Sequence, residues 1–305
     1  MPRQKFEDVA GGDTLLVDVV DEDNGYRQCT FRFTFEQHQE SFNNIPNIKC
    51  YDDDIILNSY PKTGTHWLWE MLQMVIKQTA EVSNANKLRE MIEALPTEVV
   101  DNLSSPRVLN THLKIRYLPK DIIKKRLKMV LLLRNPKDVA VSFYHHLKGI
   151  KFYEYDGKFE NFLRLFQSGG VDYGSYPEYL REWQTFIKEN PDFPVHVVYY
   201  EDLIADCLGE MRKVCEFLGK EVSADLLRQI VESCQIDKMR QVKDEKMTDA
   251  MRQAQKAALN ADFNMFRKGG IGNWKNRLTV AQNEYFDKWW DEETKDLDMF
   301  SFKFV

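Results

Sequence analysis

A tight loop between an apolar run and an amphipathic stretch constrains the fold of this chain more than any other feature. The loop, residues 60–67, reads Tyr-Pro-Lys-Thr-Gly-Thr-His-Trp and follows the apolar run at residues 55–57. After the loop, apolar residues recur every three or four positions as far as Ile76, which is the spacing of a helix. The pattern predicts a strand, a tight loop and a helix in succession.

The predicted loop has the composition of an anion site. The first backbone N–H groups of a helix lack partners inside it, and the helix dipole favours negative charge, so such a loop binds phosphate or sulfate readily. Lys62 adds a cation and Gly64 lets the backbone approach an anion closely, while Thr63 and Thr65 add hydroxyls. An ordinary surface turn capped by a threonine has the same composition, and the motif alone leaves both interpretations open.

Three further short apolar runs extend this pattern. They lie at residues 108–111, 129–133 and 195–199. Such runs are typical of strands buried on both faces, so we predict an α/β protein with a P-loop-like central parallel β-sheet flanked by helices. Ligands of parallel sheets bind at the carboxyl ends of the strands, so the chemistry is expected in the loops that follow the runs.

No Gly/Ser-rich or Pro-rich linker divides the 305 residues, so we expect a single domain over residues 1–305. Residues 51–305 would form the α/β core. Residues 1–50 would form an N-terminal extension, a β-hairpin with an Asn-Gly turn. Its second strand would run over residues 26–35, where phenylalanine alternates with other residues at positions 31, 33 and 35.

Composition excludes several classes of protein. The formal net charge of −6 argues against a protein that coats nucleic acid, so any anion site must be local. The five cysteines are widely spaced and include no Cys-x-x-Cys pair, which predicts neither a disulfide framework nor a zinc site. The N-terminus lacks an apolar signal region, and no apolar stretch is long enough to span a bilayer. We therefore expect a cytoplasmic protein without nucleic-acid or membrane partners.

Candidate residues follow two of the other predicted strands. His112 follows the second run and could accept a proton near neutral pH, although a histidine at a strand end is also often a structural hydrogen-bond partner. Arg134 follows the third run and opens a predicted helix. Ser142, two helical turns later, could share a ligand with Arg134. The alternative for Arg134 is an ion pair with Asp138.

A third basic group lies near the C-terminus. Arg267 and Lys268 stand beside Gly269 in a loop with three glycines, which could wrap an anion or be a flexible surface loop. Three candidate anion sites in one acidic chain indicate a ligand with separated phosphates. The phosphoryl-transfer loop Gly-x-x-x-x-Gly-Lys-Ser/Thr is absent because Lys62 precedes the glycine, which disfavours a kinase.

Five motifs, in this order, resemble those of the cytosolic sulfotransferases, over residues 50–295. They are Tyr-Pro-Lys-Thr-Gly-Thr-His-Trp at 60–67, Thr-His-Leu at 111–113, Arg-Asn-Pro-Lys-Asp-Val-Ala-Val-Ser-Phe-Tyr-His-His at 134–146, Tyr-Glu-Asp at 200–202 and Arg-Lys-Gly-x-x-Gly-x-Trp-Lys at 267–275. The resemblance implies transfer of a sulfuryl group from 3′-phosphoadenosine 5′-phosphosulfate (PAPS) to a hydroxyl or amine of a small molecule, with PAP as product and no metal. The two charged ends of this donor agree with separate anion sites.

The resemblance also implies roles for residues. Lys62 would face the oxygen that bridges phosphorus and sulfur, and His112 would be the general base. The 5′ end of the donor would lie in the loop of Lys62, Thr63, Gly64, Thr65, His66 and Trp67. Trp67 and Tyr200 would contact adenine. The 3′-phosphate would be held by Arg134, Ser142, Arg267, Lys268 and Gly269. Residues 275–284 match the family's dimer segment Lys-x-x-x-Thr-Val-x-x-x-Glu, which implies a homodimer through Lys275 to Glu284.

Some positions depart from the family pattern. Asn110 stands where the family often has lysine. Loss of that cation would lower the rate or leave its role to Lys62. The family's Thr-Ser-Phe nucleotide segment is here Cys-Gln-Ile at residues 234–236. His66 stands where the family usually has a small polar residue, and His146 where the phenol-sulfating members carry an aromatic. The side-chain roles of both histidines stay open, and a simple phenol pocket is placed in doubt.

Two other functions stay open. A nucleotide-binding module that has lost turnover is suggested by Asn110, while the intact Lys62 and His112 count against it. A P-loop kinase would need Mg²⁺-dependent use of ATP. If the chain is an active sulfotransferase, its acceptor would be a phenol, alcohol, steroid or amine. The acceptor pocket would be formed by variable loops, including parts of residues 36–44, 85–100, 146–155 and 240–262.

Overall fold

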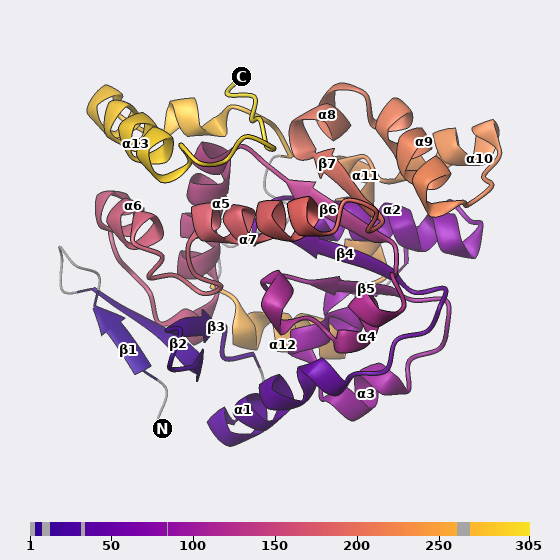
Figure 1. The fold of residues 1–305 in the computed structure, drawn as a ribbon, viewed down its shortest axis with the longest axis horizontal. Coiled ribbons are helices and arrows are strands. Elements are labelled where there is room, and N and C mark those ends of the chain that lie inside the picture. The colour runs from indigo at the N-terminus through magenta and orange to yellow at the C-terminus, as the bar shows by residue number, and fades with distance from the viewer. Residues whose placement is uncertain (1–3, 8–12, 32–33, 84, 261–268) are drawn as a thin grey trace.

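The structure is a computed structural model that describes residues 4–7, 13–31, 34–83, 85–260 and 269–305 (Figure 1). The strands are β1 (Gln4–Glu7), β2 (Thr14–Asp21), β3 (Tyr26–Gln28), β4 (Ile55–Ser59), β5 (Val108–Thr111), β6 (Met129–Leu133) and β7 (Val195–Tyr199).

The α-helices are α1 (Phe35–Asn44), α2 (Thr65–Lys77), α3 (Thr97–Asp101), α4 (Lys120–Lys124), α5 (Pro136–Gly149), α6 (Phe159–Gln167), α7 (Tyr176–Glu189), α8 (Tyr200–Ala205), α9 (Cys207–Leu218), α10 (Ala224–Ser233), α11 (Ile236–Glu245), α12 (Asp249–Ala258) and α13 (Val280–Glu293). Short 3₁₀ helices are η1 (Ile45–Asn47), η2 (Lys87–Glu90), η3 (Ile92–Ala94), η4 (Ile115–Tyr117), η5 (Lys151–Tyr153) and η6 (Asn273–Asn276). None of the helices in the described part of the chain is long and apolar enough to cross a membrane.

The central sheet has four parallel strands in the order β5-β4-β6-β7, which confirms the α/β fold predicted from the four apolar runs. In its register, Asn58 of β4 pairs with Thr111 of β5. Leu133 of β6 pairs with Tyr199 of β7. The carboxyl ends of all four strands therefore lie along one edge of the sheet, and the loops that follow them are neighbours.

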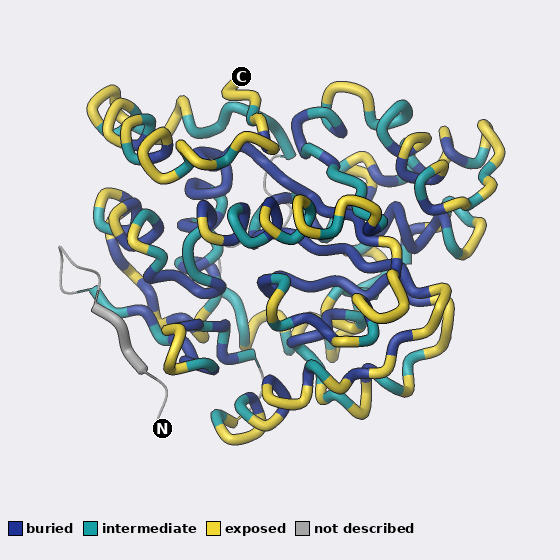
Figure 2. Tube along the Cα trace, viewed as in Figure 1, coloured by how far each residue is buried: buried dark blue, intermediate teal, exposed yellow. Residues whose placement is uncertain are grey.

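Alternate residues of the central strands enter two hydrophobic clusters, because successive side chains of a strand point to opposite faces. In β6, Val130 and Leu132 belong to the cluster that includes α2, α9 and α10. Leu131 and Leu133 belong to the cluster that includes α5, α6, α7 and α13. Figure 2 shows the strands buried between helices whose outer turns are exposed. The sheet is thus the middle layer of three.

The N-terminal extension forms a separate antiparallel sheet in the order β1-β2-β3. The predicted hairpin is present as β2 and β3, and its turn contains Gly25 at a φ of 59°. Leu15 and Val17 of β2 enter the hydrophobic cluster that contains Leu131 and Leu133 of β6. In addition, the N–H of Tyr173 donates to the carbonyl of Arg27 at 2.7 Å, so this sheet is packed onto the core.

The second strand of the hairpin is shorter than predicted. β3 ends at Gln28, and Phe35 begins α1 instead of ending a strand. The reason is a capping box: the hydroxyl of Thr34 accepts from the N–H of Gln37, whose side chain accepts from the N–H of Thr34. The alternating phenylalanines were a misleading signal, and Phe33 lies outside the described residues. Residues 36–44, expected as a variable loop, are helix α1.

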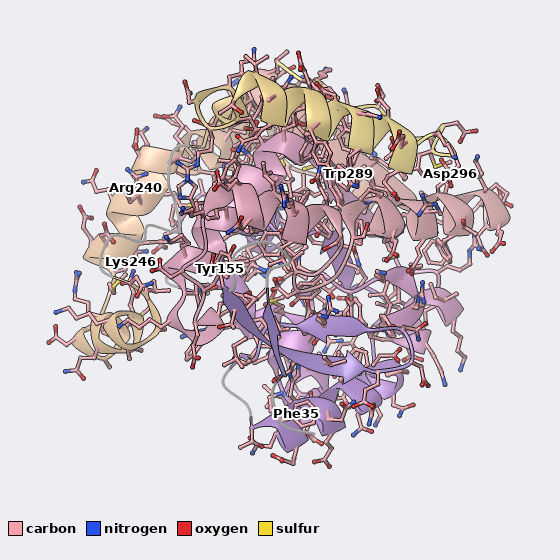
Figure 3. The ribbon with its side chains drawn as sticks, turned by 90° about the vertical axis from the view of Figure 1, so that its left-hand side faces the viewer. Phe35, Tyr155, Arg240, Lys246, Trp289 and Asp296 are labelled. Carbon is pink, nitrogen blue, oxygen red and sulfur yellow. The ribbon has the colours of Figure 1, made fainter. Side chains whose placement is uncertain are left out.

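The C-terminal helix α13 is capped by Thr279. Its buried residues Phe286 and Trp290 belong to the cluster that contains Leu131 and Leu133 of β6. In the side view of Figure 3, Trp289 on α13 and Phe35 on α1 lie at opposite ends of the molecule. Helices α9 to α12 follow one another between Cys207 and Ala258.

A buried ion pair ties the amino ends of β4 and β5 together. Arg107, just before β5, donates from Nε to Oδ1 of Asp54 at 2.9 Å, just before β4. Its Nη1 and Nη2 donate to the carbonyls of Val100 and Lys49. Both side chains of the pair are fully buried, so the guanidinium and carboxylate depend on each other for compensation of their lost hydration.

Replacing Arg107 with methionine should therefore lower the free energy of unfolding by about 3–5 kcal/mol, because the Asp54 carboxylate would stay buried without its partner. Urea unfolding followed by circular dichroism measures the loss. The control is Arg228→Met, which removes an exposed pair with Asp225 and should cost less than about 1 kcal/mol. Equal losses in the two variants would show that the buried pair does not hold these strands.

Candidate active site

The loop between β4 and α2 has the conformation of a backbone anion cradle. Lys62 has a φ of 71° and Gly64 a φ of 106°, so the chain reverses sharply before α2 begins at Thr65. The hydroxyl of Thr63 donates to the carbonyl of Tyr60 at 2.9 Å. The hydroxyls of Thr65 and Ser59 are 2.7 Å apart. Because both threonine hydroxyls bond within the loop, they shape it and leave the N–H groups at the start of α2 as its natural anion donors.

Gly64 has no room for a side chain. A Cβ there would lie 2.6 Å from Cδ2 of Tyr200, so the ring of Tyr200 packs directly on the loop backbone. Tyr200 follows β7, and its burial raises the pKa of its hydroxyl, which keeps the ring neutral. The loop after β4 and the residue after β7 are thus locked together.

Arg134 joins this cluster from the end of β6. Its guanidinium carbon lies 4.2 Å from the centre of the Tyr200 ring, a cation–π contact. Its Nη1 donates to the carbonyl of Lys62 and its Nη2 to that of Gly270, each at 3.1 Å. Its buried Nε has no hydrogen-bond partner among the described residues. Among the described residues Arg134 forms no ion pair with Asp138, which was the alternative left open by the sequence. The carboxylate of Asp138 accepts instead from the N–H groups of Gly272 and Trp274.

The aromatic side of the site is built on α2. Nε1 of Trp67 donates to the carbonyl of Cys234 at 2.8 Å, and its ring meets Tyr200 edge-on with centroids 5.7 Å apart. A Cβ at Gly269, whose φ is 58°, would lie 1.5 Å from Cδ1 of Ile236. The Cys-Gln-Ile segment therefore lies beside Trp67 and beside the start of the described C-terminal loop.

Three predicted residues are placed less directly. Ser142 lies on the second turn of α5, and within the described part of the chain no hydrogen bond joins it to Arg134. Arg267 and Lys268 lie outside the described residues. His66, on the first turn of α2, packs edge-on to Trp69 with centroids 6.1 Å apart. Burial, with Lys243, Lys87 and Lys62, holds its pKa well below the ordinary value, so its imidazole is neutral.

His112 follows β5 directly and is held on three sides. Its Nδ1 lies 2.8 Å from the carbonyl oxygen of Ser59. Its backbone N–H donates to Oε1 of Glu93 at 2.8 Å, and the ring of Tyr173 packs edge-on at 5.3 Å. Because a carbonyl only accepts, Nδ1 carries the hydrogen and Nε2 carries the lone pair.

The electrostatic setting keeps His112 unprotonated. Burial lowers the pKa of its imidazole well below the ordinary value, and the charges of Lys87 and Lys62 act in the same direction. The ammonium of Lys87 lies 3.0 Å from Nε2. A neutral imidazole with a lone pair beside a cationic loop has the form that a general base needs.

Lys62 faces a second, half-buried histidine. Its Nζ lies 3.3 Å from Nδ1 of His146, whose Nε2 is 3.5 Å from the hydroxyl of Tyr153. Tyr153 donates in turn to Oδ2 of Asp172 at 2.7 Å, and burial raises the pKa of that carboxyl to about 7. Burial, followed by Lys62, Lys87 and His112, lowers the pKa of His146 well below its ordinary value. The Lys62 side of the site is therefore polar, in agreement with the doubt about a simple phenol pocket.

The sequence did not identify Lys87, Glu93, Tyr153 or Asp172 as residues of this site. They lie away from the strand ends and glycine loops, where sequence patterns indicate anion sites. The expected acceptor segments 85–100 and 146–155 contain three of them, but no local pattern distinguished the individual residues. Arg134, Tyr200, Trp67, the Lys62 loop and Gly269 are brought together as the sequence predicted.

Comparisons with known proteins all indicate one family. The sulfotransferase domain family matches residues 52–298. Sulfotransferase 1B1 of Canis lupus familiaris is 32% identical over 267 residues, which cover 84% of this chain and 87% of the relative. Sulfotransferase 1A1 of Mus musculus is 30% identical over 259 residues, which cover 81% of this chain and 87% of the relative.

Solved structures agree with these relatives. Mouse sulfotransferase SULT7A1, in a crystal structure complexed with PAP, is similar with a TM-score of 0.72 and 28% identity, covering 90% of this chain and 94% of that one. A retinol dehydratase, in a complex with retinol and PAP, has a TM-score of 0.77 at 20% identity and covers 97% and 94%, which supports the fold alone. By its family match and its curated relatives, this chain belongs to the sulfotransferase family.

Proposed function

We propose that this enzyme transfers the sulfuryl group of PAPS to a hydroxyl or amine of a small organic acceptor, with His112 as general base. The observation that carries the proposal is the neutral imidazole whose Nδ1 is bound to the carbonyl of Ser59. Its other nitrogen, Nε2, carries the lone pair and lies 3.0 Å from the ammonium of Lys87, and the charge of Lys62 acts on the same imidazole. That pairing suits a reaction in which a proton leaves the acceptor while charge grows on a leaving oxygen.

The residues present fit the donor at both of its charged ends. For the 5′ end, the turn at Lys62 and Gly64 and the N-terminus of α2 form a cradle, in which a Cβ at Gly64 would clash with the ring of Tyr200. For the 3′-phosphate, Arg134 has a buried Nε without a partner among the described residues. Ser142 and Gly269 would join Arg134, as would Arg267 and Lys268. Adenine would lie between Trp67 and Tyr200. The complex of SULT7A1 with PAP supports this choice of donor.

The transfer step balances as an in-line displacement. An acceptor oxygen forms a bond to sulfur while the bond from sulfur to the 5′-phosphate oxygen breaks, and the electron pair stays on that oxygen. His112 takes the acceptor proton at Nε2. Lys62 stabilises the charge on the leaving oxygen. General-base assistance contributes roughly a hundred- to ten-thousand-fold to such a rate.

The acceptor would be a phenol, alcohol, steroid or amine. The chain of hydrogen bonds through His146, Tyr153 and Asp172 gives this side of the site polar groups that can bind an acceptor with a second polar substituent. We also propose one domain over residues 1–305, since β2 shares its hydrophobic cluster with β6, and a cytoplasmic location, which follows only from the sequence.

Replacing His112 with alanine should remove most turnover, by roughly a hundred-fold or more, because the acceptor would lose its base. The assay uses labelled PAPS with a panel of phenols, steroids, alcohols and amines, and the affinity for PAP is measured by calorimetry. PAP should bind as before. His196→Ala, which removes a histidine stacked on Phe217 outside the site, is the control and should keep its activity.

Two outcomes would contradict the proposal for His112. Retained turnover in His112→Ala would exclude it as the base. A large loss of PAP affinity would instead make it a structural residue. If the unmodified protein binds PAP tightly but sulfates no acceptor in the panel, the nucleotide-binding module becomes the better description.

Replacing Arg134 with alanine should weaken PAP binding by roughly 1.5–3 kcal/mol, the range for a hydrogen bond to a charged group. Calorimetric titration with PAP measures the change. Arg181→Ala, which removes an exposed ion pair with Asp296, should leave the titration unchanged. Identical affinities in the two variants would remove Arg134 from the nucleotide site.

We further propose a homodimer through Lys275 to Glu284. Val280 and Tyr285, at the start of α13, are 76% and 62% exposed, which is unusual for large hydrophobic residues and suits a small self-contact. Val280→Glu should therefore give a monomer in light scattering, whereas Val99→Glu, an exposed valine on α3, should not. A monomeric unmodified protein at tens of micromolar would refute the dimer.

A further inference from the structure

Lys87 is held beside His112 by the strand that carries the histidine. It begins η2, in a segment that runs along β5, where Met91 pairs with Asn110. Two further bonds anchor the same segment: Glu93 accepts from the hydroxyl of Thr111 and from the N–H of His112, each at 2.8 Å. The segment is thus fixed to β5 by buried hydrogen bonds although it is not itself a strand.

The side-chain amide of Asn110 contacts both the backbone carbonyl and the ammonium of Lys87. Its Nδ2 donates to the carbonyl of Lys87 at 2.7 Å. Its Oδ1 lies 3.5 Å from the ammonium of the same lysine. The side chain of Asn110 is fully buried, so its amide is committed to this contact. A lysine at position 110, which has no acceptor, could not make it.

The ammonium of Lys87 lies against the imidazole of His112, and the carboxylate of Glu93 attracts it without forming an ion pair. It lies 3.0 Å from Nε2 of His112 and 3.5 Å from Sδ of Met91. Among the described residues, no carboxylate forms an ion pair with it. A partly buried cation without a directly paired carboxylate is costly, and such groups gather at functional sites. A purely structural lysine would be expected to pair with an acid.

We propose that Lys87 is the positioning residue of His112: its ammonium orients the imidazole and keeps Nε2 unprotonated until the acceptor arrives. The proposal rests on His112 being the general base. When the acceptor proton moves to Nε2, Lys87 withdraws to Oδ1 of Asn110 and keeps all its own protons. The bond changes at sulfur are those of the proposed transfer. Asn110, the position that departs from the family pattern, therefore holds a cation that comes from another segment.

The charge of Lys87 should influence the pKa of His112, and therefore the pH dependence of kcat/KM, in one direction. The groups that face His112 are Lys62, Lys87 and His146, with Glu93 at its backbone and Tyr173 at its ring. Lys87 is charged where His112 titrates, because burial lowers the pKa of Lys87 only to about 8. Removing that charge should raise the pKa of His112. The acid limb of kcat/KM should then move to higher pH.

The test uses Lys87→Met, Lys87→Arg and Asn110→Ala, with Arg89→Met as the matched control. Arg89 lies on the same turn as Lys87 and its side chain is exposed, so its removal changes the net charge equally. Three quantities are measured: the pH profile of kcat/KM with PAPS and the best acceptor, the pKa of His112 by NMR, and the affinity for PAP. The NMR titration needs no turnover.

Lys87→Met should raise the pKa of His112 by about one unit, which lowers kcat/KM about tenfold on the acid limb, at pH values below both pKa values. Lys87→Arg should keep both near those of the unmodified protein, because the guanidinium stays charged. Arg89→Met should shift neither. Asn110→Ala should shift the pKa in the same direction as Lys87→Met, and the double variant should go no further, since Asn110 acts through Lys87.

An unchanged pKa of His112 in Lys87→Met would overturn the proposal, even if activity falls. An equal shift in Arg89→Met would also overturn it, because the effect would then be one of net charge. If Lys87→Met does not fold, Asn110→Ala decides in the same way, since it leaves the lysine in place. Failure of the proposed function would show differently, as turnover that survives in His112→Ala or is absent for every acceptor. In that case the NMR titration still decides whether Lys87 controls His112.

Discussion

The parallel register of the four central strands decides which side chains meet. Because Asn58 pairs with Thr111, the next residues, Ser59 and His112, are neighbours, and the imidazole donates to the carbonyl of Ser59. On the other side, Leu133 pairs with Tyr199, so Arg134 and Tyr200 meet as cation and ring. A slip of one residue would turn every side chain of a strand to the other face and separate these pairs. The two hydrophobic clusters that fix the register therefore also fix the chemistry.

The site concentrates positive charge in a chain whose net charge is −6. The charges of Lys62 and Lys87 act on histidines that burial holds neutral, and Arg134 is compensated by carbonyl oxygens instead of a carboxylate. Cations kept out of water in this way are unfavourable until an anion reaches them. The proposed donor, which carries charge at both ends, would offset that cost at two places.

The sequence predicted those features whose causes are local. Apolar runs gave the four strands, and His112 and Arg134, directly after two of them, could be placed because a parallel sheet brings its carboxyl ends together. Tyr200 was named only through the family resemblance. Local signals also conflicted: the capping box at Thr34 outweighed alternating phenylalanines and ended β3 early. Lys87 could not be found, because its segment has no periodicity. Its place depends on buried side chains, such as Glu93, that reach across to β5.

Asn110 and Lys87 are best understood as one unit. A lysine on β5 would have its direction set by the pleat of the strand, whereas a lysine on η2 must be held by a neighbour. The amide of Asn110 can do so because it donates to the carbonyl of Lys87 and accepts from its ammonium. With lysine at both positions, two ammonium groups would compete for one place. With asparagine alone, a buried amide would lose its partner. The two positions therefore constrain each other, and the cation beside His112 can come from outside the strand only because residue 110 is not lysine.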